Sequence, residues 1–294
     1  MAFFDELDSI MREDPGNRGL IPSLPANPVA KLYDALNGAE RVVLLTGFPV
    51  RLDNGEYIGE TDGPCGTANI AAALEKIGAK VLPLTDEEGL KPFAAALKAL
   101  GCASEPCVIP GMNTADFICK KLDEFMPTHI ITLERPGKAS DGHYHNMRGT
   151  IIDDMLMDTS CIIDEGKKRG IMTISVGDGG NEIGMGGLGE AIEANVPHGQ
   201  EICARECAQI AVVSGVSNWW GWGIAALLSL MHGKNLLPDN ELEMKIINAV
   251  VAAGGVDGCT KENAATVDNL SMDVHLGILN KVQKALKEEL QKQA

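Results

Sequence analysis

Short apolar runs alternate with amphipathic stretches along most of the chain. Continuous apolar runs predict strands at 42–46, 80–84, 106–109, 129–133, 171–176 and 210–213. Stretches with helical periodicity predict helices at 67–77, 87–100, 113–125, 158–169 and 219–231. Strands that are apolar throughout are typical of parallel strands covered by helices on both faces. The pattern therefore predicts a doubly wound α/β protein with a mainly parallel sheet.

The two ends of the chain depart from this alternation. Residues 1–27 are predicted to form an N-terminal helix and an extended arm, and residues 28–294 a single α/β catalytic domain. From Pro238 onward the chain is predicted to be wholly helical, closing with a charged amphipathic helix over 275–291. Since no repeat or long linker interrupts the sequence, we expect one domain with helical extensions at both ends.

Charge and composition narrow the range of partners. The 294 residues include 25 Lys and Arg against 41 Asp and Glu, a net charge of −16 without a marked basic patch, so we expect no nucleic acid partner. Residues 207–233 carry no Asp, Glu, Lys or Arg, but the polar turn 214–218 interrupts them. This stretch therefore predicts a strand, a turn and a buried helix, and no membrane association.

The N-terminus and the cysteines bear on the compartment. Five acidic residues within the first fourteen match neither a secretory signal nor a transit peptide. The eight cysteines are scattered and have no zinc-ligand spacing, which favours reduced thiols. We therefore expect a cytoplasmic protein. These features leave assembly into a homo-oligomer open.

Four polar, glycine-rich segments follow predicted strands. In open parallel sheets, ligands bind beyond the carboxyl ends of the strands, so these segments are expected to converge at one mouth. They are residues 60–67, 134–149, 177–184 and 214–218.

Two of these segments carry candidate chemistry. Seven glycines among residues 177–189 suggest backbone that closely approaches a ligand, with Gly179, Gly180 and Asn181 as contacts. Residues 134–148 combine arginines that can bind an anion, here called clamps, with side chains that can donate or accept protons. The clamps are Arg135 and Arg148, and the proton-moving groups are Glu134, Asp141, His143 and His145.

Motifs for other chemistries are absent or misplaced. The sequence has no P-loop, no Gly-x-Ser-x-Gly and no His-Glu-x-x-His. Seven residues separate Gly184-x-Gly186-x-x-Gly189 from the end of the preceding predicted strand, so this motif does not indicate a dinucleotide site. The candidate groups described above favour an enzyme that needs no metal ion, and two other interpretations of the same residues stay open. One is a non-catalytic sensor that binds an amino acid or a nucleotide. The other is a metal-dependent enzyme acting on a small carboxylate or phosphate, with Asp62, Asp178 and Glu182 as ligands.

The four segments together resemble one family. Glu60-Thr61-Asp62-Gly63-Pro64, Glu134-Arg135-Pro136-Gly137, residues 177–186 and Ser217-Asn218-Trp219 with Gly221 are similar to the C-terminal domain of the D-glutamate cyclase family, also found alone in bacteria. The similarity runs from about residue 28 to 265. It implies a hydro-lyase that converts D-glutamate to 5-oxo-D-proline with loss of water, located in the mitochondrial matrix in eukaryotic relatives.

A glutamate-like dicarboxylate substrate suggests roles for these residues. Arg135 and Arg148 are expected to hold carboxylates, Asp178 or Glu182 to take the ammonium proton, and His143 or His145 to protonate the departing oxygen, with Glu134 also in the catalytic set. Backbone N–H groups at 63–67 and 179–181 are expected to stabilise the oxyanion. The remaining expected substrate contacts are Asp62, Gly63, Gly66, Thr67, Ser217 and Asn218. No cofactor is expected to be required, with a divalent ion as the alternative.

Overall fold

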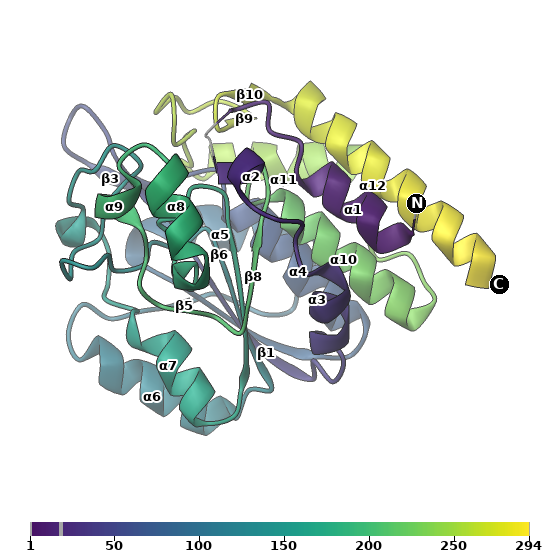
Figure 1. Ribbon diagram of the computed structural model, residues 1–294, viewed down its shortest axis with the longest axis horizontal. Coiled ribbons are helices and arrows are strands. Elements are labelled where there is room, and N and C mark those ends of the chain that lie inside the picture. The colour runs from purple at the N-terminus through teal and green to yellow at the C-terminus, as the bar shows by residue number, and fades with distance from the viewer. Residues whose placement is uncertain (1, 18–19, 294) are drawn as a thin grey trace.

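A six-stranded parallel sheet forms the centre of the computed structural model, which describes residues 2–17 and 20–293 (Figure 1). Its order is β5-β4-β1-β6-β7-β8. These strands are β1 (Arg41–Thr46), β4 (Lys80–Thr85), β5 (Cys107–Val108), β6 (His129–Leu133), β7 (Met172–Gly177) and β8 (Ile210–Val213). The predicted strands and the α/β class are confirmed.

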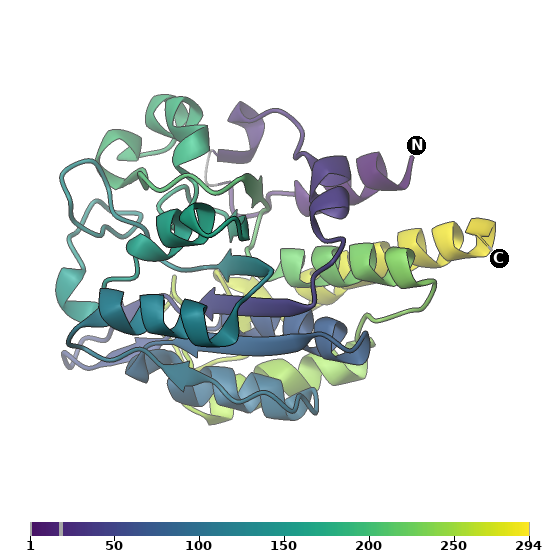
Figure 2. The same cartoon turned by 90° about the horizontal axis from the view of Figure 1, so that it is seen from below.

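Helices cover both faces of the sheet (Figure 2). Side chains alternate along β1, so Val42 and Leu44 join the larger hydrophobic core whereas Val43 and Leu45 join a second core on the other face. The larger core includes side chains of α4 (Pro64–Lys76), α5 (Glu87–Ala99), α10 (Trp219–His232) and α11 (Asn240–Ala252). The second includes side chains of α6 (Thr114–Phe125) and α7 (Cys161–Lys168). This two-sided burial explains why the strands are apolar throughout.

The ends of the chain pack together. Helices α1 (Phe3–Met11) and α12 (Met272–Gln293) lie side by side, and apolar residues of both belong to the larger core (Figure 1). Two short helices, α2 (Leu20–Ser23) and α3 (Val29–Ala35), lead into β1. None of the described helices combines the length and the apolar character needed to cross a membrane.

The prediction of an all-helical segment after Pro238 is wrong. Helix α11 ends near Gly254, which adopts a φ of +100°, and residues 253–271 form a loop with the short strands β9 (Thr266–Val267) and β10 (Leu270–Ser271). The buried Asp257 carboxylate organises this loop by accepting hydrogen bonds from the backbone N–H groups of Cys259, Thr260 and Asn269.

Several short elements lie in segments that the sequence pattern left as loops. A hairpin of β2 (Pro49–Arg51) and β3 (Tyr57–Gly59) follows β1. The 3₁₀ turn η1 (Asp153–Met155) precedes α7, and the turn η2 (Gly186–Leu188) precedes α8 (Gly189–Asn195) and α9 (Gly199–Ile202). These elements are too short for hydrophobic periodicity to reveal them.

The strand order places a crevice in the middle of the sheet. From β1 the chain winds outward through β4 and β5, then returns to β6 on the other side of β1. The pairing of Thr46 with Leu133 aligns the carboxyl ends of β1 and β6 at this reversal. The connections that follow these two strands leave in opposite directions, and in open α/β sheets this is the place where ligands bind.

Candidate functional site

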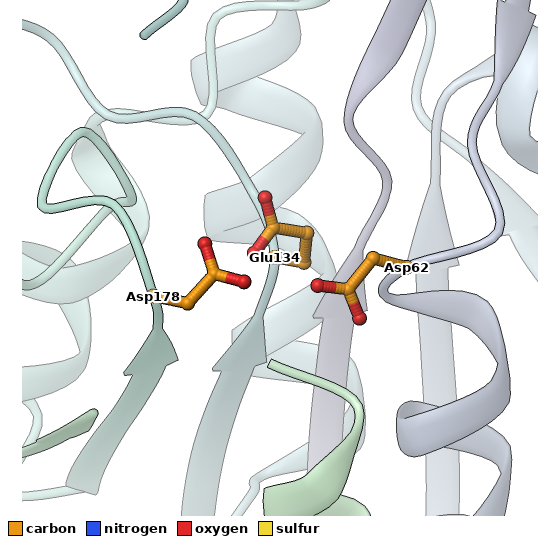
Figure 3. A group of neighbouring side chains, drawn as sticks. All are labelled: Asp62, Glu134 and Asp178. Carbon is orange, nitrogen blue, oxygen red and sulfur yellow. The ribbon is translucent and has the colours of Figure 1, made fainter. Parts of the chain in front are cut away.

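Three buried carboxylates meet at the crevice. Glu134 follows β6, Asp178 follows β7 and Asp62 lies just before α4, and all three side chains point toward one another (Figure 3). Each offers a carboxylate oxygen, and these oxygens lie within 4.8 Å of one another. Because buried like charges repel strongly, this cluster requires a shared proton, a bound cation or hydrogen-bond donors.

The start of α10 supplies donors to all three carboxylates. The Ser217 backbone N–H lies 3.1 Å from Asp62 Oδ2 and 3.2 Å from Asp178 Oδ2, and its hydroxyl donates to Glu134 Oε2 at 2.6 Å. The Asn218 backbone N–H donates to Asp62 Oδ1 at 2.8 Å. The positive end of the helix dipole adds to this stabilisation of negative charge. Ser217 and Asn218 therefore hold the cluster together.

The Asn218 side chain joins the starts of α4 and α10. Its Oδ1 accepts hydrogen bonds from the backbone N–H groups of Gly63 and Gly66, at 3.0 and 2.6 Å, while the Thr67 N–H donates to the Gly63 carbonyl. A Cβ on Gly66 would lie 2.7 Å from the Asn218 Cα, so only glycine permits this approach. The expected role of the Gly63, Gly66 and Thr67 amides in binding an oxyanion is thus corrected, because these three donors already have partners within the protein.

Glu182 has a similar structural role. Its carboxylate accepts hydrogen bonds from the backbone N–H groups of Asp178, Gly179 and Gly180 at 2.7–2.9 Å. A Cβ on Gly177 would lie 2.5 Å from the Glu182 carboxyl, so glycine there accommodates Glu182 itself. The expectations that Glu182 is a proton acceptor or metal ligand and that the amides at 179 and 180 face a ligand are corrected, because these groups satisfy one another.

The acid–base character of Glu134 is strongly perturbed by its surroundings. Burial and the negative charges of Asp178, Glu182, Asp62 and Glu60 raise the pKa of its carboxyl well above the usual range. The same surroundings favour the protonated form, which can donate a proton. Such a carboxyl has the properties of a general acid.

A cavity of about 620 Å³ opens above the cluster. Glu60, Glu134 and Asp178 contribute acidic groups to its wall, and Asn181 and Arg148 also line it. The Asn181 side chain donates to the backbone carbonyl of His145 at 2.9 Å, which ties the loop after β7 to the loop after β6. The predicted convergence of these loops on one cavity is correct for Glu134, Arg148, Asp178 and Asn181.

Arg148 is well placed to bind an anion. It is exposed at the cavity, and within residues 2–17 and 20–293 no carboxylate lies within ion-pairing distance of its guanidinium. The other cations on the wall are already paired: Arg51 lies 2.7 Å from Asp154, and Lys261 lies 3.3 Å from Asp53.

Arg135 is a structural residue, which corrects its expected role as a substrate clamp. Its guanidinium is 0% exposed and forms an ion pair with Asp86 at 2.5 Å. It also donates to the backbone carbonyl of Met157 and to the hydroxyl of Thr159. With these partners and no exposure to the cavity, it cannot also hold a substrate carboxylate.

The two histidines do not line the cavity, which corrects their expected position beside a departing oxygen. The exposed His143 pairs with Asp153 at 2.6 Å, and this partner raises the pKa of the imidazole. The buried His145 ring lies between Asp141 Oδ2 at 3.0 Å and the Gly149 carbonyl at 3.1 Å. Both therefore stabilise the fold of the 139–155 loop.

Sequence reasoning did not include Glu60 among the candidate residues. Its buried side chain lines the cavity and adds negative charge near Glu134. The sequence feature that could have identified it is its position in the same Glu-Thr-Asp-Gly run as Asp62. Arg51 and Asn146 on the cavity wall carried no comparable signal, because the hairpin and the loop that position them could not be predicted.

Together the sheet reversal and the buried carboxylates define an α/β protein with an acidic candidate site at its topological switch point. The family described as D-glutamate cyclase-like, C-terminal matches residues 7–283, so the chain belongs to this family. It is also 34% identical over 242 residues to the human protein D-glutamate cyclase, mitochondrial. That alignment covers 77% of this chain and 39% of the human protein, so the chain spans well under half of its relative's length.

Among solved structures, a variant of actinorhodin polyketide ketoreductase with NADPH matches with a TM-score of 0.30 and 15% sequence identity. The match covers 67% of this chain and 66% of the ketoreductase. A likeness at this level supports no statement about ligands or chemistry.

Proposed function

We propose that this chain cyclises D-glutamate to 5-oxo-D-proline with loss of water. Membership of the D-glutamate cyclase-like family supports the substrate, and the meeting of Asp62, Glu134 and Asp178 beneath a cavity supports the chemistry. This carboxylate cluster is the observation on which the proposal depends.

The charges of the cavity match a glutamate zwitterion in one orientation. The substrate ammonium binds near the carboxylates of Asp178 and Asp62, whose negative charges attract it. Arg148 binds the α-carboxylate, because it is the cation on the wall that has no acidic partner in the described part of the chain. The γ-carboxyl group then lies between the amine and Glu134.

Ring closure moves two protons from nitrogen to oxygen. Asp178 accepts the ammonium proton, and the neutral amine attacks the γ-carbon. Glu134 in its protonated form donates to a γ-oxygen, which leaves as water after it receives a second proton from the nitrogen. No oxidant or reductant is needed, and holding the amine against the γ-carbon supplies several kcal/mol of the acceleration.

The test is incubation of the purified protein with D-glutamate and quantification of 5-oxo-D-proline by chiral chromatography. Turnover by the wild-type protein that falls at least about 100-fold in Glu134→Gln supports the proposal. A thermal shift with D-glutamate but no product would instead support a sensor of amino acids. Absence of both turnover and binding, with and without divalent metal, would contradict the proposal.

A metal-dependent reaction on a small carboxylate is the second candidate, favoured by the close approach of three carboxylates. A hard divalent ion could take oxygen ligands from Asp62, Glu134 and Asp178. Glu134 replaces Glu182 in the set of ligands that the sequence predicted. Elemental analysis after dialysis against Mg²⁺ or Mn²⁺ tests this candidate. One bound ion per chain that is lost in Asp178→Asn would support it, whereas no retained metal and chelator-insensitive turnover would support the metal-free reaction.

A further inference from the structure

The cavity is larger than D-glutamate requires. Pockets of about 300–1,000 Å³ hold drug-sized ligands, and this one measures about 620 Å³. A five-carbon amino acid therefore occupies only part of it. The carboxylates lie at the ends of β6 and β7, so the substrate ammonium and its reacting carbon belong to that part.

The cavity also has an apolar wall that a diacid would not use. This wall comes from the hairpin after β1 and from the segment around η1, which the Arg51–Asp154 ion pair joins at 2.7 Å. Its side chains are Phe48, Val50, Met147, Ile151, Ile152 and Met155. Ile151 is 47% exposed, although large aliphatic side chains gain from burial. Phe48, Val50, Ile152 and Met155 are at most 9% exposed and form the packed base of this wall, so the exposed apolar side chain among those named is that of Ile151. An exposed apolar side chain at a cavity is typical of a ligand subsite.

The charges on the cavity wall also favour a substrate with only one free carboxylate. Glu60, Glu134 and Asp178 are acidic, whereas Arg148 is the cation without an acidic partner in the described residues. The single guanidinium of Arg148 can neutralise one substrate carboxylate. A glutamate whose γ-carboxyl is blocked as an amide keeps the ammonium and the α-carboxylate but loses the second negative charge, so it matches the wall better than free glutamate does.

We infer that the site also cyclises γ-amides of D-glutamate whose amine substituent is uncharged and apolar, with the substituent held on the Phe48–Ile151 side of the cavity. The inference rests on the proposed cyclisation and extends its substrate class. The α-amine attacks the γ-carbonyl carbon, the new C–N bond closes the lactam, and the original amide C–N bond breaks. Of the two protons lost by the α-ammonium, one passes to the departing amide nitrogen and the other is released to solvent by way of Asp178, so the products are 5-oxo-D-proline, the neutral amine and a proton.

The experiment compares γ-D-glutamyl-4-nitroanilide with D-glutamate on the same protein preparation. Release of 4-nitroaniline is followed by absorbance, 5-oxo-D-proline is quantified by chiral chromatography, and reactions without protein give the spontaneous rate. We expect kcat/KM for the anilide to exceed that for D-glutamate by at least about tenfold. Ile151→Asp should shift the ratio of the two kcat/KM values at least about tenfold toward D-glutamate. Met112→Asp, at an 82% exposed apolar residue away from the cavity wall, should leave the ratio unchanged.

The outcomes separate this inference from the proposed function. Turnover of D-glutamate without cyclisation of the anilide would overturn the inference alone. Cyclisation of the anilide without turnover of D-glutamate would support the inference and contradict the proposed substrate. Hydrolysis of the anilide to D-glutamate, or an unchanged ratio in Ile151→Asp, would overturn the inference because the apolar wall would then not hold the leaving group.

Discussion

Glu243 provides a test of how burial controls charge in the core that supports the site. It lies on α11, and its Oε2 accepts hydrogen bonds from the Asn69 side chain of α4 at 3.0 Å and from the Trp222 indole of α10 at 3.2 Å. Burial raises the pKa of its carboxyl from 4.5 to about 7, and the two donors only partly oppose this shift. The folded protein therefore holds the Glu243 proton more tightly than the unfolded chain does.

The sign of the effect on stability follows from this difference. The stabilisation from the bound proton is fully present below pH 4.5 and is lost as the pH rises through 7. At about 1.36 kcal/mol per pH unit, the loss across this interval is about 3 kcal/mol. Glu243→Gln keeps an acceptor oxygen for both donors but has no proton to lose. Relative to wild type, we expect this variant to gain about 3 kcal/mol in free energy of unfolding between pH 4.5 and pH 8.

Urea unfolding at several pH values measures this gain. The intrinsic fluorescence of Trp219, Trp220 and Trp222 reports it, because all three indoles are buried in α10. Glu241→Gln is the matched control, since Glu241 lies on the exposed side of the same helix. A difference between Glu243→Gln and wild type that does not change with pH would refute the reasoning. The positive end of the α11 dipole would then outweigh burial.

Three further predictions concern the site and its support. Ser217→Ala removes the hydroxyl bonded to Glu134, so we expect about tenfold lower kcat and about 1 kcal/mol less stability, with partial rescue of kcat by Ser217→Thr; an unaltered kcat would remove Ser217 from the positioning of Glu134. Arg148→Ala should raise KM for D-glutamate about 10- to 100-fold with little change in Tm, because the side chain is exposed, and steady-state kinetics with thermal melting will show whether this holds. Arg135→Ala should instead lower the free energy of unfolding by about 3–5 kcal/mol, because a buried ion pair loses one partner; an unaffected midpoint in urea would argue against its structural role.

Most of the fold could be predicted from the sequence because burial on both faces leaves a strong local pattern. The predicted strand 129–133 agrees with β6 residue for residue, and the predicted helix 87–100 differs from α5 by one residue. The errors lie where the pattern is weak. The loop 253–271 depends on Gly254 and on the contacts of Asp257, and these side-chain to backbone contacts have no periodicity.

The location of the candidate site could be predicted from the sequence, but the role of each residue in it could not. The rule that ligands bind at the carboxyl ends of parallel strands was enough to select the segments that contain Asp62, Glu134 and Asp178. Residue type alone could not distinguish Arg148, which faces the cavity, from Arg135, which is buried against Asp86. A guanidinium binds a substrate or a protein carboxylate by the same chemistry, and only its position decides which.

The sequence by itself determined the α/β class, the strand positions and the family, because local hydrophobicity and short loop motifs encode them. Only the tertiary structure decided which polar groups remain available for a ligand. The carboxylate of Glu182 and the amides of Gly63 and Gly66 bond within the protein and do not line the cavity, whereas the carboxylates of Glu134 and Asp178 accept hydrogen bonds from Ser217 and also line the cavity. The physical reason is that hydrogen bonds and buried charges depend on neighbours distant in the chain, and the fold alone brings those neighbours together.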